Sequence, residues 1–507
     1  MNYDILIDVS VCEKRLAIVE DGEAIEIQIE RPFPERLVGN IYRGIVNTVL
    51  PGMQAAFVDI GMDKNAFLYA GDVVSRLDFE QDHMESETDI LKDFRIETVL
   101  KAGQEIAVQV IKEPMGTKGP RVTTNISLPG RYVVLLQNSE HIGVSRRISD
   151  EDERLRLKEL AKANLPKGFG LIMRTVAEGL SEEEMKHELV LLKRLSDAVE
   201  KKMKAAKVAP CIHKDSDLVE RAIRDILTDD VARVIINDVN EYERILEFAE
   251  TVAPEMKHKI QLYNKSYNLF EFYGVSAALD SIRERKVWLK SGGYLVIDKT
   301  EALTVIDVNT GKFTGSHSLE ETVFKTNMEA AKEIPYQLRL RDIGGIIVVD
   351  FIDMKTDENQ AEVLDLLKQE IRRDKTKATV IGMTGLGLIE ITRKKVKQEV
   401  NTFLGADCLY CGGTGKITSP YVVVRRVEAD LERLLGLNKH TQIPATPGPA
   451  GQQKVKVELH PSIAAVINAR GCELGTVIKR HFAREIEFSS NSLLGYEEIR
   501  VRFLDEE

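Results

Sequence analysis

Two short apolar runs in this chain each deliver an aspartate where the run ends. One runs from Leu303 to Asn309 and reads LTVIDVN, with Asp307 near its end; the other reads IIVVD and ends on Asp350. Runs of this length, rich in β-branched residues and bounded by glycine or polar residues, predict buried strands. Two carboxylates on neighbouring strands favour a hard divalent cation such as Mg²⁺, whose bound water can attack a phosphodiester.

Asn309 adds a third polar group to this pair. Side chains two residues apart on a strand share a face, so we expect Asn309 to point the same way as Asp307 and to hold that carboxylate or a metal-bound water. Asp353 follows Asp350 by three residues and is expected to face elsewhere. The alternative, that each strand-end aspartate only caps the next turn, stays open at this point.

The second sharp motif is Cys408-Leu-Tyr-Cys411 followed by Gly-Gly-Thr-Gly. Two cysteines at this spacing on a glycine-rich turn are half of a tetrahedral zinc site. The other cysteines (Cys12, Cys211 and Cys472) are isolated, so we expect the second half from another copy of the chain, which gives a Cys₄ site across a dimer. A thioredoxin-type redox pair is the alternative, but it calls for a helix start after a strand rather than a glycine loop.

The bulk properties limit the classes of function. The 507 residues carry a formal net charge of −11, which argues against indiscriminate binding of polyanions, so any nucleic-acid site must be a local basic patch. Five cysteines do not make a disulfide framework, and they indicate a reducing cytoplasm. No apolar run reaches the ~18 residues of a membrane helix, so no membrane span is expected.

Short, closely spaced strands between residues 38 and 112 predict a small barrel such as an OB-fold. Phe57 and Phe67 lie on its strands and Lys112 ends the last one. Two rings beside a cation could bind single-stranded nucleic acid, because bases stack on rings and the cation contacts phosphate. On the pattern alone, the favoured alternative is that both phenylalanines belong to the barrel core.

A strand predicted over Gly168–Thr175 ends on Arg174 and Thr175, where a guanidinium beside a hydroxyl could hold a phosphate; a surface salt bridge is the usual alternative. Capping boxes at Ser149 with Asp152 and at Ser181 with Glu184 predict the helices on either side of this strand. Farther on, alternating helices and strands from 212 to 400 predict α/β units that contain both aspartate strands.

These pieces, in this order, resemble the ribonuclease E/G family over essentially the whole chain. The resemblance is carried by eight segments: NIYRGIV (40–46), AFVDIG (56–61), TNISLPG (124–130), GVSRRI (143–148), LIMRT (171–175), EALTVIDVN (301–309), LRLRDIGG (338–345) and VVDFIDM (348–354).

The resemblance implies a multidomain chain of α/β and α+β parts. The implied parts are an RNase H-like domain in two pieces (1–37 and 216–283), an inserted OB-fold RNA-binding domain (38–118), an inserted 5′-end sensor domain (119–215), a DNase I-like catalytic domain (284–404), a zinc link (405–418) and a small C-terminal α/β domain (419–507).

The same resemblance implies roles for named residues. Asp307 and Asp350 would bind the catalytic Mg²⁺, and Asn309 would orient Asp307 or the attacking group. The residues implied to hold the RNA strand are Phe57, Phe67 and Lys112. Those implied to bind a 5′-monophosphate are Gly130, Val134, Arg174, Thr175 and Lys377. Those implied to share a structural Zn²⁺ with a second chain are Cys408 and Cys411.

Three departures from the family pattern bear on these roles. Leu409 stands where proline is usual, which affects the rigidity of the zinc turn more than ligation. Lys377 stands where arginine is common, and because lysine cannot make the bidentate fork, a weaker preference for 5′-monophosphate ends is expected. An acidic stretch near residues 76–100 is longer than in short family members.

The expected function is Mg²⁺-dependent endonucleolytic hydrolysis of single-stranded RNA, with 5′-monophosphate sensing and products that carry 5′-phosphate and 3′-hydroxyl ends. The chain resembles a compact member of the family that acts in rRNA and tRNA processing and mRNA decay, as a homo-oligomer built from zinc-linked dimers or tetramers. A non-catalytic, ribosome-associated RNA-binding protein is the main alternative, and it would not need two aligned carboxylates. A DNA nuclease is the third.

Overall fold

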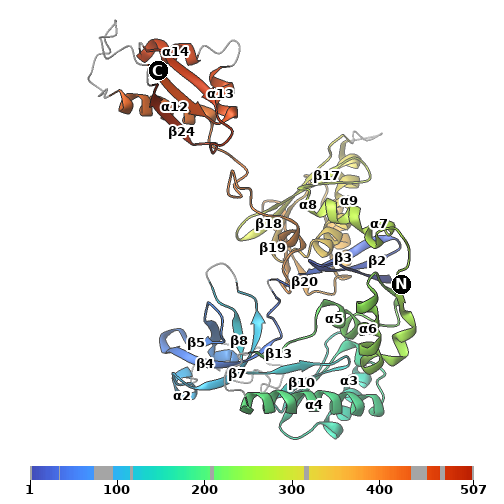
Figure 1. The fold of residues 1–507 in the computed structure, drawn as a ribbon. Coiled ribbons are helices and arrows are strands. Elements are labelled where there is room, and N and C mark those ends of the chain that lie inside the picture. Colours follow the sequence, from blue (N-terminus) through green and yellow to red (C-terminus); the bar gives the residue numbers. More distant parts are fainter. Residues whose placement is uncertain are drawn as a thin grey trace. The chain divides into compact units, whose positions relative to one another are not determined.

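The structure is a computed structural model that describes residues 3–33, 35–73, 95–114, 118–205, 211–312, 319–435, 454–468, 474–482 and 484–504. Most of the acidic stretch near 76–100 and Cys472 lie outside the described residues. The chain divides into two compact units, residues 1–404 and 405–507. Figure 1 colours both along the sequence.

The N-terminal strands share a sheet with strands from much later in the chain. The strands, in their order across this sheet, are β15 (Ile260–Leu262), β14 (Val231–Ile236), β1 (Tyr3–Val9), β2 (Lys14–Glu20) and β3 (Glu23–Glu30). Asp21 and Gly22, with φ angles of 48° and 82°, form the predicted turn between β2 and β3. Helices α5 (Leu218–Asp225) and α6 (Val239–Val252) complete this α/β layer.

The predicted small barrel is present. Its strands, in spatial order, are β4 (Ile41–Leu50), β5 (Ala55–Asp59), β6 (Ala66–Tyr69), β8 (Arg121–Thr123) and β7 (Glu105–Lys112). β7 pairs back onto β4, which closes the five strands, and β13 (Cys211–His213) adds to β4 from outside. A closed barrel of five short strands is consistent with an OB-like fold.

A four-stranded sheet and two helices follow the barrel. The sheet runs in the order β11 (Ile142–Val144), β12 (Phe169–Met173), β10 (Val133–Gln137) and β9 (Ser127–Pro129). The helices are α3 (Glu151–Asn164) and α4 (Glu182–Ala205). β12 ends sooner than predicted, because Thr175 already begins the 3₁₀ turn η3 (Thr175–Ala177).

One predicted helix start is wrong and the other is confirmed. The cap of α3 is Asp150 rather than Ser149: its carboxylate accepts from the amide of Asp152 at 3.0 Å, because Asp150 directly precedes the first helical residue. Ser181 and Glu184 exchange the reciprocal hydrogen bonds of the predicted capping box.

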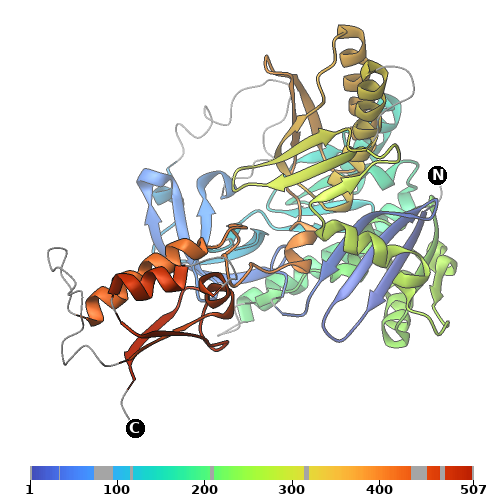
Figure 2. The same cartoon turned by 90° about the horizontal axis from the view of Figure 1, so that it is seen from above.

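The sheet that carries both aspartates is covered by helices on one face. Its strands, in spatial order, are β16 (Lys286–Trp288), β17 (Tyr294–Lys299), β18 (Leu303–Asn309), β19 (Gly345–Asp350), β21 (Leu388–Arg393) and β20 (Ala378–Met383). Helices α9 (Leu319–Leu340) and α10 (Asp357–Ile371) lie side by side (Figures 1 and 2). They bury the strand residues that point toward them. Even positions of β18, such as Ile306 and Val308, are buried, so odd positions point to the other face.

The second unit contains Cys408, Cys411 and a small α/β fold. Its sheet runs in the order β23 (Ile486–Ser490), β22 (Val455–Leu459) and β24 (Ile499–Phe503). Its helices are α12 (Pro420–Leu434), α13 (Pro461–Ile467) and α14 (Leu474–Phe482). In neither unit is any described helix long and apolar enough to cross a membrane.

Candidate active site and RNA-binding surfaces

Asp307 and Asp350 lie directly opposite each other on neighbouring strands. β18 and β19 are parallel, and their register pairs the Cα atoms of these two residues. Neighbouring strands lie about 4.8 Å apart, so the two carboxylates leave the sheet side by side. Both residues are exposed, on the face opposite α9 and α10.

Asn309 points the same way as Asp307, as predicted. Its Nδ2 donates to Oδ2 of Asp307 at 2.8 Å, which fixes one oxygen of that carboxylate. Asp353 is exposed in the segment after β19, outside this ladder. No described residue gives either carboxylate a turn-capping amide, so the structure does not favour the capping alternative.

The donor set at this place suits Mg²⁺. Two like charges directly opposite in a ladder repel each other, and a cation between them removes that cost. Mg²⁺ prefers one or two carboxylates and keeps several waters, which an exposed pair permits. In the described part of the chain no group of three or more His, Cys, Asp or Glu residues is placed to hold a metal, so a fuller protein cage is not available there.

Phe57 and Phe67 lie outside the barrel core, contrary to the alternative that the pattern favoured. They are Cα partners on β5 and β6, and their rings meet edge to face with centroids 6.1 Å apart. Alternation explains the placement, because Ala56, Val58, Ala66 and Leu68 fill the core and their neighbours must point outward.

Lys112 completes a lateral row with these rings. Phe67 pairs with Arg121 on β8, and Arg121 pairs with Lys112 on β7. Arg121 was not predicted from sequence. Its guanidinium pairs with Asp72 at 2.6 Å and lies 5.8 Å from the centroid of the Tyr69 ring. Two half-buried rings and an exposed lysine therefore follow one another across the outer wall of the barrel.

Two of the residues predicted to bind a 5′-phosphate, Gly130 and Arg174, meet at the turn between β9 and β10. Nη1 of Arg174 donates to the carbonyl of Gly130 at 2.6 Å, and the Arg174 amide donates to the carbonyl of Tyr132 at 2.8 Å. Thr175 is exposed next to Arg174, and its hydroxyl lies 2.9 Å from that of Ser145. Val134 is half-buried on β10, where it pairs with Pro129 and Ile172.

Lys377 lies in a different sheet from the other four. It is exposed just before β20, and its carbonyl accepts from the amide of Lys394 at 2.9 Å. Within the described residues no hydrogen bond or ion pair joins Lys377 to Gly130, Arg174 or Thr175.

Glu188 on α4 shapes this turn, and sequence reasoning did not find it. Its carboxylate accepts the amides of Arg131, Tyr132 and Val133, at 3.1 Å for the last. Burial raises the pKa of Glu188, although these amides act in the opposite direction. A Cβ at Gly130 would lie 2.5 Å from Oε1 of Glu188, so any other residue here would displace the Glu188 carboxylate.

Asp225 was also missed. Its Oδ1 accepts from Nη1 of Arg174 at 2.6 Å, and Nε of Arg224 donates to the same oxygen at 2.9 Å. Burial acts to raise the pKa of Asp225, but the two arginines outweigh it and hold that pKa below its usual value. Among the described residues both contacts of the Arg174 side chain start from Nη1, and a guanidinium has further donors on Nε and Nη2.

Cys408 and Cys411 lie in an exposed turn of the second unit. The amide of Gly412 donates to the carbonyl of Cys408 at 2.8 Å, and that of Gly415 donates to Sγ of Cys411 at 3.4 Å. Hydrogen bonds from the amides of Gly415 and Gly413 hold the pKa of the Cys411 thiol below its usual value. Amides aimed at a sulfur stabilise the thiolate, which is the form that binds zinc.

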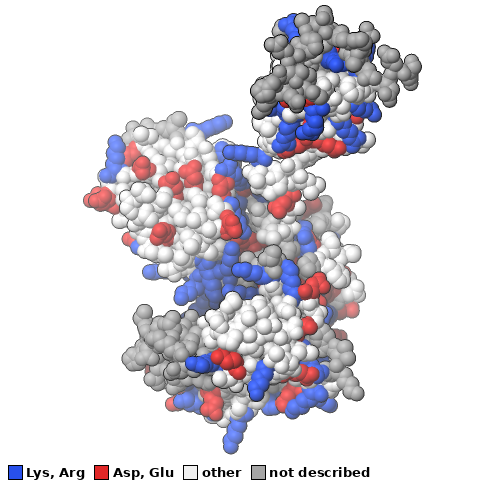
Figure 3. Space-filling model, turned by 90° about the vertical axis from the view of Figure 1, so that its left-hand side faces the viewer, with Lys and Arg blue, Asp and Glu red and all other residues white. Residues whose placement is uncertain are grey.

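Charge is unevenly distributed over the surface. On the face shown in Figure 3, Lys and Arg side chains gather in the middle of the view, whereas acidic side chains are scattered. A chain with a net charge of −11 therefore still presents a local basic patch.

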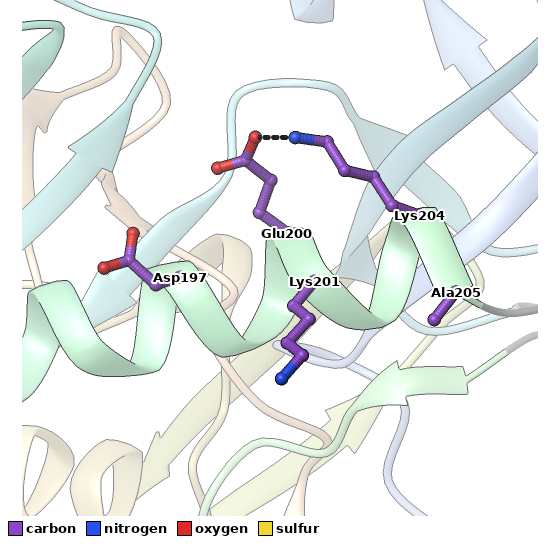
Figure 4. Close-up of a pocket in the computed structure, with 5 residues that line it drawn as sticks. All are labelled: Asp197, Glu200, Lys201, Lys204 and Ala205. Atoms are coloured by element: carbon purple, nitrogen blue, oxygen red, sulfur yellow. Dashed lines mark hydrogen bonds and ion pairs between the residues drawn. The ribbon is translucent and has the colours of Figure 1, made fainter.

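A hollow of about 470 Å³ lies elsewhere, along the C-terminal end of α4. The described residues that line it all come from that helix: Asp197, Glu200, Lys201, Lys204 and Ala205. Figure 4 shows Glu200 and Lys204 joined by an ion pair and Lys201 pointing away from them. Pairs of this kind are typical of a solvated helix face, so we assign no function to it.

Comparisons with known proteins place the chain in one family. Residues 127–396 match the model of the ribonuclease E/G family. Ribonuclease G of Haemophilus influenzae is 41% identical over 450 residues, which cover 88% of this chain and 90% of that protein. Ribonuclease G of Escherichia coli is 38% identical, covering 92% of this chain and 95% of that protein. Ribonuclease E of Nostoc sp. is 39% identical, covering 79% and 58% respectively.

Among solved structures, spermidine synthase from Thermotoga maritima aligns at 10% identity with a TM-score of 0.10, over 41% of this chain and 62% of that one. This likeness is too weak to bear on the fold.

The chain thus combines a closed barrel of five strands with a sheet that aligns two carboxylates on an exposed face. The chain belongs to the ribonuclease E/G family. By class it is an endoribonuclease.

Proposed function

We propose that the chain hydrolyses single-stranded RNA endonucleolytically with Mg²⁺, leaving 5′-phosphate and 3′-hydroxyl ends. The observation that carries this proposal is the register of β18 and β19, which sets Asp307 opposite Asp350 on an exposed face. A merely structural sheet has no need of two unneutralised acids directly opposite each other.

The roles within the site follow from the contacts. Asp307 and Asp350 would hold the metal, and the Asn309 amide keeps one oxygen of Asp307 in a fixed direction. When bound, Mg²⁺ supplies an activated water and neutralises charge that develops on the phosphate. Because both carboxylates are exposed, a phosphodiester of an unpaired strand can reach them.

The barrel would bind the strand away from the cut. A base can stack on Phe57 or Phe67, whose rings face outward, and Lys112 at the end of the same row can meet a phosphate. Any base can stack on a ring, so this surface would distinguish unpaired from paired RNA without reading the base sequence.

We also propose that the turn between β9 and β10 senses the RNA 5′ end. Arg174 is held against this turn, and Thr175 offers a hydroxyl beside it. Lys377 would join the pocket from the segment before β20, and as a point charge it would select a monophosphate less sharply than arginine.

The remaining proposals concern assembly and biological role. Cys408 and Cys411 would bind a structural Zn²⁺ together with the same pair of a second chain, since a CxxC turn supplies half of the ligands. The substrates would be rRNA and tRNA precursors and mRNA, and the first piece of the chain would complete an RNase H-like domain with β14 and β15.

Cleavage assays test the central proposal. The purified protein is incubated with matched oligoribonucleotides that carry a 5′-monophosphate or a 5′-triphosphate, and with the DNA equivalent, with and without Mg²⁺. We expect Mg²⁺-dependent internal cuts in RNA, with faster turnover of the 5′-monophosphate form. Asp307→Asn and Asp350→Asn should abolish cleavage and keep RNA binding.

Asp353→Asn is the matched control, because Asp353 is an exposed carboxylate near the pair but outside the ladder. It should cleave at the wild-type rate. Mg²⁺-dependent turnover in both ladder variants would refute the assignment. Binding without cleavage by the wild type would favour the RNA-binding alternative, and equal cutting of DNA would favour the DNA nuclease.

A further inference from the structure

The open face of the catalytic sheet carries an aromatic cluster beside the carboxylates. Trp288 on β16 is the Cα partner of Tyr294 on β17, and Tyr294 is the Cα partner of Asn309 on β18. These three side chains therefore form one lateral row on the face of Asp307. The Trp288 and Tyr294 rings meet edge to face, with centroids 5.4 Å apart.

A lysine is held over both rings. Nζ of Lys286 lies 3.5 Å from the centroid of the Tyr294 ring and 4.0 Å from that of Trp288. Lys286 pairs with Val296, and Val296 pairs with Asp307, so the lysine stands in the same lateral row as the two carboxylates. The backbones of Lys286 and Asp307 are thus two strand spacings apart, about 10 Å, and the rings hold the ammonium over Tyr294 on β17, the strand between them.

The indole of this cluster is open to solvent, whereas Lys286 and Tyr294 are half-buried. Trp288 is 55% exposed although it is the largest side chain in the protein, and Ile346 on β19 is 52% exposed on the same open side of the sheet. Burying an indole is strongly favourable, so an exposed one beside a catalytic site points to a ligand with a flat apolar face.

We propose that this cluster is a base-stacking subsite for the RNA strand next to the cut. A base stacks on the exposed indole of Trp288, Tyr294 supports that ring edge-on, and Lys286 meets a backbone phosphate. The inference rests on the proposed nuclease function, because it takes Asp307 and Asp350 as the place of the scissile phosphate. It extends that function by assigning a nucleotide-binding site on the catalytic sheet itself, separate from the row on the barrel.

The ligand chemistry follows from the contacts. A base offers a π-face that can stack on the indole. The two rings that contact Lys286 carry no net charge, and the phosphate of the nucleotide would supply a negative charge to the ammonium. The lysine carries little conformational freedom when it sits between two rings, so less entropy is lost on binding. A strand that passes from Trp288 to Asp307 crosses only β17.

Intrinsic fluorescence gives a direct test, because Trp288 is the one tryptophan in the sequence. The full chain carrying Asp350→Asn is titrated with a single-stranded oligoribonucleotide in Mg²⁺, so that the RNA stays intact. Stacking should quench the emission. In a series of oligonucleotides with one abasic position each, quenching should disappear only when the gap lies beside the position that the wild type cuts.

Kinetics on the otherwise wild-type chain supply the second measurement. Trp288→Ala should raise KM on the order of 10-fold with a small effect on kcat, and Trp288→Phe should restore most of the affinity. Lys286→Gln should lower the slope of log affinity against log salt by about one. Ile381→Ala is the control, because Ile381 is a 62% exposed residue of the same sheet on the strand farthest from β16.

The outcomes separate this inference from the proposed function. Suppose that the wild type cleaves RNA, but tryptophan emission does not change and Trp288→Ala has the wild-type KM. The proposed stacking subsite is then wrong, and the proposed nuclease function is unaffected. If the wild type does not cleave, the nuclease proposal fails. Emission that follows protein concentration and not RNA would mean that a second protein copy covers this face, which also overturns the subsite.

Discussion

The Asp225 carboxylate accepts a 2.6 Å hydrogen bond from Nη1 of Arg174, the arginine that we propose for the RNA 5′-phosphate. The guanidinium is thus already partly neutralised from within the chain. An incoming phosphate must either share this arginine with Asp225 or displace it, which makes Asp225 a built-in competitor.

Removing that competitor should strengthen the response to the 5′ end. In Asp225→Asn the full charge of Arg174 becomes available, so we expect the ratio of kcat/KM for 5′-monophosphate over 5′-hydroxyl RNA to rise a few-fold. Asp4→Asn is the control, since Asp4 forms a comparable pair with Arg233 on the N-terminal sheet. A ratio that falls in Asp225→Asn would mean that Asp225 positions Arg174 rather than competing for it.

The same pair predicts how stability depends on pH. The arginines hold the folded-state pKa of Asp225 below its unfolded value, so its contribution is present above the unfolded pKa of about 3.9 and is lost as pH falls through the folded pKa. We expect Asp225→Asn to cost roughly 1–2 kcal/mol at pH 7. Thermal unfolding at a series of pH values should show this difference shrink below about pH 4; a constant difference would contradict it.

Gly130→Ala should disturb the 5′ pocket through Glu188. The new Cβ would meet Oε1 of Glu188 at 2.5 Å, and three backbone amides keep that carboxylate from moving away. Overpacking of this kind costs about 1–3 kcal/mol. We expect a lower Tm and a smaller preference for 5′-monophosphate RNA. Gly52→Ala, which adds a Cβ in open space, should leave both unchanged; equal Tm values for the two variants would contradict the clash.

Asn309→Ala should slow the reaction without abolishing it. The variant removes the 2.8 Å hydrogen bond that orients Asp307 but leaves both carboxylates in place. Loss of such a supporting bond typically costs about 10- to 100-fold in metal affinity or activity. A titration of Mg²⁺ against cleavage rate should show a higher half-saturation point. If the Mg²⁺ titration curve of Asn309→Ala is the same as that of the wild type, Asn309 has no role in the site.

The double variant Cys408→Ser with Cys411→Ser should lower the assembly state. Serine does not supply the thiolates that zinc requires, so bound zinc by elemental analysis and mass by light scattering should fall together. Cys12→Ser is the control, since Cys12 is exposed on the N-terminal sheet domain. An unchanged mass in the double variant would count against a zinc-linked dimer.

The placement of Asp307 and Asp350 on neighbouring strands could be predicted from sequence because the signal is local. An apolar run that ends on aspartate fixes which end of the strand carries the acid, and two such runs with a helix between them favour parallel neighbours. The hydrogen bond of Asn309 to Asp307 followed from the two-residue period of a strand.

The residues that could not be predicted from sequence reach the sites through contacts between segments that are distant in the chain. Glu188 and Asp225 reach their partners from helices far along the chain, and neither has a distinctive neighbourhood in sequence. Trp288 comes near Asp307 only through two antiparallel pairings. The outward position of Phe57 was misjudged because a hydrophobic residue on a short strand fits either face until the core-filling neighbours are known.

The pairing of β18 with β19 also decides which misfolded forms can persist. Shifting one strand by a single residue would turn Asp307 or Asp350 into the apolar core between the sheet and helices α9 and α10. Burying an unpaired charge there is very costly. Burial under α9 and α10 therefore selects against the one-residue slips that would separate the two acids. A stable variant that keeps both acids but loses activity should be examined first for changes in the groups around them.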